Sequence, residues 1–122
     1  HFIEPGVLQA GDKIIKAKKI VLATGSTPII PNAWKAFGDK VITTDQFFEQ
    51  KNFPTDMAVI GMGVIGLELG QSLSRMDINV TGFDAATTIG GLDDKATSKV
   101  AHQTISKEFP IHLGQVAELS QE

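Results

Sequence analysis

The sequence predicts an α/β fold, a βαβαβ unit with a parallel sheet, preceded by a β-hairpin segment. Three observations predict it. A short apolar run, residues 57–60, leads directly into a glycine-rich turn, apolar residues then recur at helical spacing, and an acid, Asp84, ends the next strand-like segment. Strands that alternate with helices imply right-handed crossovers and therefore parallel strands.

Composition narrows the class of protein. The 122 residues are 42% hydrophobic and 20% charged with 12 glycines, as in a folded, turn-rich domain. A net charge of −3 gives no electrostatic reason to expect nucleic acid or an anionic membrane as partner. No apolar run is long enough to span a bilayer and no signal-type segment opens the chain, so we expect a cytoplasmic protein. With no Cys, these residues hold no thiol nucleophile, and we expect neither a catalytic residue nor a metal site among them.

The first part of the chain predicts short strands followed by a linker. Residues 7–23 contain two or three strand-like segments around a turn at Gly11, and residues 19–23 are the most apolar and β-branched of them. Small residues and Pro28 end the pairing, so residues from 28 to about 38 are the expected linker. Thr44 and Asp45 predict the N-cap of a short helix over residues 46–50. We therefore expect a first segment over 1–30, a linker with a short helix over 31–56 and the main unit over 57–122.

In the main unit each element has its own signal. Residues 57–60 predict a buried parallel strand, and the helix expected from Val64 to about Met76 presents Ile65, Leu69, Leu73 and Met76 at helical spacing. Gly70 is expected to let this helix pack closely. Residues 79–84 predict the second strand, Asp93 and Asp94 open a second helix that runs to about Lys107, and residues 110–113 begin a third strand.

The turn has the chemistry that a dinucleotide pyrophosphate requires. In the pattern Gly61-Met62-Gly63-Val64-Ile65-Gly66, the first glycine permits the tight turn, the second lets the backbone approach the phosphates, and the third lets helix and strand pack together. The helix start adds free N–H groups and a positive dipole end. Asp84 follows Gly66 by 18 residues, near the ~20 expected of an acid that binds a ribose 2′-OH. An equally simple role for Asp84 is to cap the end of its strand.

Two segments at this separation resemble the pyridine nucleotide–disulfide oxidoreductase family. Residues 20–28 (IVLATGSTP) are similar to its ATG-type segment, and residues 59–70 (VIGMGVIGLELG) are similar to its NAD-site turn. The resemblance also covers the proline linker and residues 90–93, and within the family it is closest to dihydrolipoamide dehydrogenases. It implies a Rossmann-like three-layer unit. It also implies a homodimeric flavoenzyme in which hydride passes between NAD and FAD, and FAD exchanges electrons with a nearby Cys pair.

The resemblance also implies roles for individual residues. It places Gly61, Gly63 and Gly66 under the NAD pyrophosphate, and it makes Met62, Val64 and Ile65 of the same turn cofactor-binding residues. It places Asp84 and Ala85 at the adenosine ribose, and Glu68 near the nicotinamide ribose, although a solvated helix residue is an equal alternative for Glu68. Thr24 and Gly25 are placed near FAD, where residues 1–30 are the last strands of the FAD-binding segment.

The chain also departs from the family pattern. Met62 and Gly82 replace a glycine and a β-branched residue, and Asp84 replaces the usual Glu. The FAD glycine motif, the Cys pair and the dimer domain of the family are absent from these residues. We therefore expect an excised part of a larger enzyme, colourless and inactive by itself, with an incomplete NAD-binding unit.

Other assignments stay open at this point. Within the family these are a glutathione-type reductase, a mercuric reductase or a soluble transhydrogenase. Outside it, they are a non-catalytic dinucleotide-binding module and a domain for another adenine cofactor, such as a methyl donor.

Overall fold

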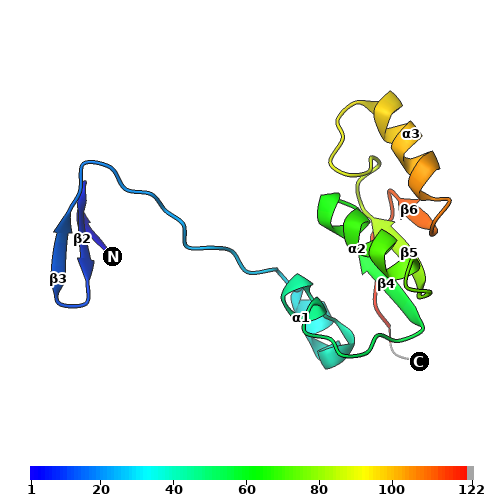
Figure 1. Cartoon of the computed structure of the whole chain (residues 1–122), viewed down its shortest axis with the longest axis horizontal. Coiled ribbons are helices and arrows are strands. Elements are labelled where there is room, and N and C mark those ends of the chain that lie inside the picture. Colours follow the sequence, from blue (N-terminus) through cyan, green and yellow to red (C-terminus); the bar gives the residue numbers. More distant parts are fainter. Residues whose placement is uncertain (121–122) are drawn as a thin grey trace. The chain divides into compact units, whose positions relative to one another are not determined.

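The computed structural model describes residues 1–120 and divides into two compact units, His1–Pro31 and a second unit that begins at Asn32 (Figure 1). The division at Pro31 lies next to the expected end of the first segment. No helix within residues 1–120 is long and apolar enough to cross a membrane.

The first unit is a small antiparallel sheet. Its strands are β1 (Phe2–Glu4), β2 (Val7–Ala10) and β3 (Lys13–Lys16), in the order β1-β2-β3. Gly11 turns the chain between β2 and β3 with φ +59°, a conformation that favours glycine. Val7 is buried, whereas every residue of β3 is exposed. The predicted hairpin is confirmed.

The strand predicted over residues 19–23 is wrong. The chain has no regular structure between Ile20 and Pro31, and Val21 is 86% exposed there. β-branched residues favour a strand only where a neighbouring strand supplies hydrogen-bond partners and packing. Within the described residues of this unit, β3 pairs with β2 alone, so residues 19–23 have no ladder to join.

The second unit begins with two short helical segments. A 3₁₀ segment, η1 (Asn32–Lys40), is bent at Gly38, so the predicted linker ends earlier than residue 38. Helix α1 (Thr44–Phe47) begins before the expected residue 46, and its N-cap is Thr43. Both the amide and the hydroxyl of Thr43 donate to Oε1 of Gln46, each at 2.8 Å. The prediction that Thr44 and Asp45 form the cap is therefore wrong by one residue.

The remaining elements form the predicted βαβαβ unit. They are β4 (Asp56–Ile60), α2 (Val64–Ser74), β5 (Asn79–Asp84), α3 (Lys95–Ile105) and β6 (Ile111–Leu113) (Figure 1). The strands are parallel in the order β4-β5-β6, and the register places Ile60 beside Phe83 and Phe83 beside His112. The predicted α/β fold with its parallel sheet is confirmed.

The core lies between helix α2 and the sheet. Its buried members are Met62, Leu73, Val80, Ile89, Phe109 and Ile111. A Cβ on Gly70 would lie 2.6 Å from Cζ of Phe109. Gly70 therefore allows the helix to rest directly on the Phe109 ring, as its predicted packing role requires.

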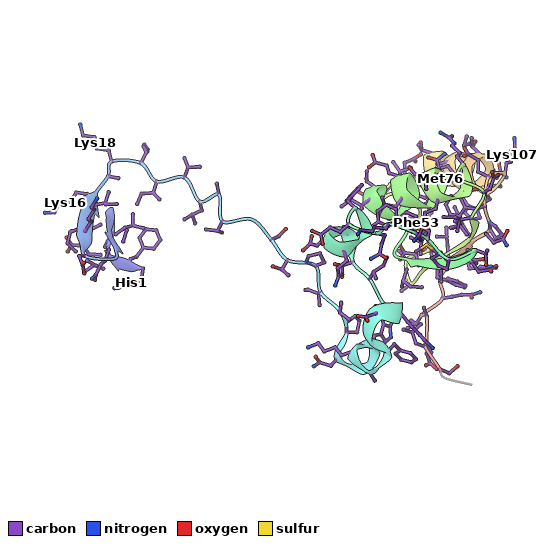
Figure 2. The ribbon with its side chains drawn as sticks, turned by 60° about the horizontal axis from the view of Figure 1, so that its bottom comes forward. His1, Lys16, Lys18, Phe53, Met76 and Lys107 are labelled. Atoms are coloured by element: carbon purple, nitrogen blue, oxygen red, sulfur yellow. The ribbon has the colours of Figure 1, made fainter. Side chains whose placement is uncertain are left out.

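The predicted buried face of α2 is only partly right. Leu73 is 1% exposed, but Ile65 and Met76 are 60% and 56% exposed. The helix ends at Ser74, before Met76, which is labelled in Figure 2. The periodic spacing misled because the glycine-bearing side of the helix, with Gly66 and Gly70, comes closest to its neighbours.

Candidate functional site

The glycine turn joins the carboxyl end of β4 to the start of α2. Gly61 has φ +100°, which a residue with a Cβ rarely adopts, and its amide donates to the carbonyl of Phe83 at 2.7 Å. The turn is thereby attached to the end of β5. In open α/β sheets, this carboxyl edge is where ligands bind.

Gly66 is required by packing. A Cβ on Gly66 would overlap the carbonyl oxygen of Gly61. Helix α2 can cross this close to the end of β4 only because residue 66 has no side chain.

Gly63 has neither of these reasons to be glycine. Its φ is −68°, an ordinary value for any residue, and apart from the adjoining backbone no atom of the protein lies within 4 Å of the position that a Cβ would occupy. The backbone of Gly63 thus borders open space at the start of a helix. A phosphate fits such a place, because a group approaching the backbone there meets no side chain.

The first turn of α2 adds hydrogen-bond donors. Gly63 is the N-cap residue and supplies no side-chain cap, although its carbonyl accepts from the amide of Leu67 at 3.0 Å. The amides of Val64, Ile65 and Gly66 belong to the first turn, which has no intrahelical acceptor for them. Together with the positive dipole end of the helix, these amides favour an anion.

Asp84 lies beside the turn at the end of β5. Its Oδ2 accepts from the amide of Met62 at 2.6 Å, and its Oδ1 accepts from the amide of Ala86 at 2.8 Å. An ionised carboxylate has about four acceptor sites, so each oxygen can accept one more hydrogen bond. The side chain therefore caps its strand end and still retains acceptor capacity for a ribose. Ala85, next to it, is exposed.

The other predicted site residues lie apart from this group or in the other unit. Glu68 is exposed on α2, and its side chain makes no hydrogen bond within the described residues, while its backbone carbonyl accepts from the hydroxyl of Ser72. Thr24 and Gly25 belong to the first unit, where both are exposed and Gly25 has φ +72°. Within residues 1–120 no three His, Asp or Glu side chains are grouped to hold a metal ion.

Sequence reasoning missed how the turn is held in place. The amide of Gly90 donates to the carbonyl of Met62 at 2.7 Å, so the loop after β5 is tied to the same residue as Asp84. Gly90 and Gly91 both have positive φ, at +67° and +69°. The glycine pair was the available signal that this loop folds back on itself.

The fold and the turn define a Rossmann-type unit, and comparison with known proteins specifies the family. The family model described as "Pyridine nucleotide-disulphide oxidoreductase" matches residues 2–122. The chain belongs to this family of oxidoreductases. Residues 20–28 and 59–70 are the segments that resemble it in sequence.

Similar proteins include dihydrolipoyl dehydrogenases. The chain is 31% identical over 112 residues to dihydrolipoyl dehydrogenase 2, chloroplastic, of Arabidopsis thaliana, covering 90% of the chain and 20% of that protein. It is 33% identical over 114 residues to the mitochondrial dihydrolipoyl dehydrogenase of Schizosaccharomyces pombe, covering 88% and 22%. The chain thus spans about a fifth of the length of these relatives.

Solved structures show the same fold. The flavoprotein disulfide reductase RclA of Escherichia coli matches with a TM-score of 0.73 at 21% identity, over 93% of this chain and 26% of that one. The water-forming NADH oxidase of Lactobacillus brevis, solved with NADH bound, matches with a TM-score of 0.64 at 25% identity, over 85% and 25%.

Proposed function

We propose that residues 57–120 bind NAD, with the pyrophosphate at the Gly61–Gly66 turn and at the first turn of α2. The observation that carries the proposal is Gly63. The fold accounts for Gly61 through its positive φ and for Gly66 through helix packing, but no neighbour or backbone angle accounts for Gly63. Close approach of a ligand to the backbone explains the missing side chain. The NADH bound to the oxidase of Lactobacillus brevis supports the same assignment.

The proposed cofactor is NAD rather than NADP because of Asp84 and Ala85. A carboxylate accepts hydrogen bonds from ribose hydroxyls, a charge-assisted contact of about 1.5 to 3 kcal/mol, and repels a 2′-phosphate. A site for NADP usually has an Arg nearby. Residues 84–88, Asp-Ala-Ala-Thr-Thr, contain none.

The test is an NADH titration of the chain and of Gly63→Val. The wild type is expected to bind, and the valine side chain is expected to abolish binding because it fills the space at the turn. Asp94→Ala is the control, since it removes the side-chain cap of α3, where Asp94 accepts from the amide of Thr97, and leaves the turn intact. Asp94→Ala should lower the unfolding temperature without weakening NADH binding. Equal loss of binding in both variants, or none in Gly63→Val, would contradict the proposal.

For the whole protein we propose an FAD-dependent disulfide oxidoreductase of the dihydrolipoyl dehydrogenase type, acting as a homodimer. Family membership and the dihydrolipoyl dehydrogenases among its relatives support this proposal. In it, Glu68 lies near the nicotinamide ribose, and Thr24 and Gly25 lie near FAD. The bound cofactors supply the hydride chemistry, while residues 57–120 bind and orient NAD.

The enzyme proposal has its own test. These 122 residues contain no Cys, so the redox Cys pair has to come from other residues of the protein. Coding sequence adjacent to this segment should encode such a pair, and the protein that includes it should reduce NAD with dihydrolipoamide as electron donor. Adjacent sequence without a Cys pair would instead favour a non-catalytic nucleotide-binding module.

The cytoplasmic location of the protein stays a prediction.

A further inference from the structure

Met62, the second residue of the turn, has a fully buried side chain between α2 and β5. It is 0% exposed and belongs to the core. A Cβ on Gly82 of β5 would lie 2.5 Å from its Sδ, and a Cβ on Gly66 of α2 would lie 3.4 Å from its Cε. The thioether therefore occupies the volume that a side chain at residue 82 would need.

The two residues that depart from the family pattern are thus complementary. A methionine at position 62 fits because position 82 has no side chain, and the methionine fills the gap that Gly82 leaves in the strand. Interiors are packed densely enough that either change alone would leave a void or an overlap.

The backbone of Met62 is fixed as well. Its amide donates to Oδ2 of Asp84 at 2.6 Å, and its carbonyl accepts from the amide of Gly90 at 2.7 Å. The next residue is Gly63, the N-cap of α2. Holding residue 62 on three sides therefore limits how the backbone of Gly63 can move.

We propose that Met62 is a positioning residue of the nucleotide site: its side chain, fitted against Gly82, fixes the turn so that Gly63 and the first amides of α2 are held ready for the pyrophosphate. A site held in its binding geometry loses less conformational freedom when the ligand binds. The inference rests on the proposed NAD function. It differs from simple core packing, in which Met62 would affect stability alone.

The test compares Met62→Ala with Leu73→Ala. Leu73 is buried to the same degree in the same core, on α2, but lies outside the turn. Both variants should lose stability. Measured at a temperature where each is folded, NADH affinity should fall about tenfold or more in Met62→Ala and stay within about twofold of wild type in Leu73→Ala.

Gly82→Ala is a second, independent test of the proposal, and it can be measured even if Met62→Ala does not fold. In the wild type, the added methyl meets the Met62 sulfur and lies 3.2 Å from Cε2 of Phe109, so it should lower both the unfolding temperature and NADH affinity. In a Met62→Ala background, Gly82→Ala should lower the unfolding temperature and NADH affinity less than it does in the wild type, because the overlap with the sulfur is gone and only the contact with Phe109 remains.

The outcomes separate the two proposals. A wild type that binds NADH, with Met62→Ala and Gly82→Ala binding equally well, overturns this inference and leaves the proposed function standing. Additive effects of the two changes on affinity also overturn it. A wild type that binds no NADH, even in a titration followed by NMR at millimolar concentration, overturns the proposed function and the inference with it.

Discussion

The three glycines of the turn have three different physical reasons. Gly61 has a backbone angle that favours glycine, Gly66 lies against the Gly61 carbonyl, and Gly63 faces open space. The sequence pattern predicts the tight turn at Gly61 and the close packing at Gly66, and the structure has both. The approach of a phosphate to Gly63 stays a proposal. Only the structure separates the two glycines that stabilise the fold from the one that borders open space.

Asp84→Asn is expected to weaken NADH binding and to reduce the difference in affinity between NADH and NADPH. The amide side chain keeps one oxygen, so it loses a charge and one of the acceptors that now take the amides of Met62 and Ala86. Loss of one charge-assisted bond predicts a fall in NADH affinity of roughly tenfold or more. Calorimetric titrations with both nucleotides measure the ratio.

Asp93→Asn is the matched control for charge. Asp93 is exposed near the start of α3, and its side chain makes no hydrogen bond among the described residues. It should leave both affinities unchanged, whereas Ala85→Arg should favour NADPH. If Asp84→Asn leaves the ratio of the two affinities where it was, Asp84 is a strand cap and not a ribose ligand.

Gly70→Ala is expected to destabilise the fold. The new Cβ would lie 2.6 Å from Cζ of Phe109, whose ring is 3% exposed and has little room to move. Overpacking of this kind costs about 1 to 3 kcal/mol. Ser72→Ala, an exposed site on the same helix, controls for the change in helix propensity. Chemical denaturation that shows no greater loss for Gly70→Ala than for Ser72→Ala would disprove this packing argument.

At the scale of elements, local signals predicted the βαβαβ unit well. The apolar run before Gly61 and the acid after residue 83 predicted the bounds of strands β4 and β5 to within one residue. Asp94 is the N-cap of α3, where hydrogen bonds from the hydroxyl and amide of Thr97 hold its pKa below the ordinary value. These elements were predictable because their signals lie within a few residues of one another.

The features that escaped prediction depend on distant residues. Residues 19–23 have strand-like composition but no partner strand, and Ile65 has the right spacing but lies on the open side of α2. The bond between Asp84 and the amide of Met62 joins the end of β5 to the turn before α2, 22 residues apart in the chain. Such a contact exists only once the sheet has formed, so periodicity gives no sign of it.

A surface cluster joins the end of α2 to the residues after α3. Glu108 accepts from Nε of Arg75 at 2.8 Å and from the side chain of Gln71 at 2.8 Å. The Arg75 bond, and after it the Gln71 bond, lowers the pKa of Glu108. A lowered pKa means that the contribution to stability is present above the ordinary pKa of about 4.3 and is lost as the pH falls through the lower folded value.

Glu108→Gln should therefore lower the unfolding temperature slightly at pH 7, by roughly a few degrees, because the pair is exposed to solvent. The difference from wild type should shrink as the pH falls below about 4. Glu118→Gln is the control, because the Glu118 side chain is exposed and makes no hydrogen bond among the described residues. Thermal unfolding at pH 7, 5 and 3 measures both. A difference that stays constant over this range would mean that the Arg75 pair does not stabilise the fold.

At the scale of the whole molecule, the segment 20–31 is the expected site of proteolysis. It has no regular structure, and Val21, Leu22 and Ile29 are each more than 70% exposed. Extended, exposed backbone is cut faster than hydrogen-bonded elements. Brief digestion with chymotrypsin should therefore cut after Leu22 before any bond within residues 56–113.

Mass spectrometry of the early fragments identifies the first cut. Leu73 is the matched control, because it offers the same side chain from within helix α2. Cutting at Leu73 as early as at Leu22 would show that the second unit is not the more stable of the two.

The central claim is that the turn at Gly61–Gly66 holds a dinucleotide. Its most direct test is NMR of the ¹⁵N-labelled chain during addition of NADH. The account predicts that the amide signals of Gly63, Val64, Ile65, Gly66 and Ala85 shift together with one dissociation constant. Amides at the other end of the sheet, such as Met57 and Val80, should not move. Shifts confined to that other end, or no shifts at millimolar NADH, would contradict the claim.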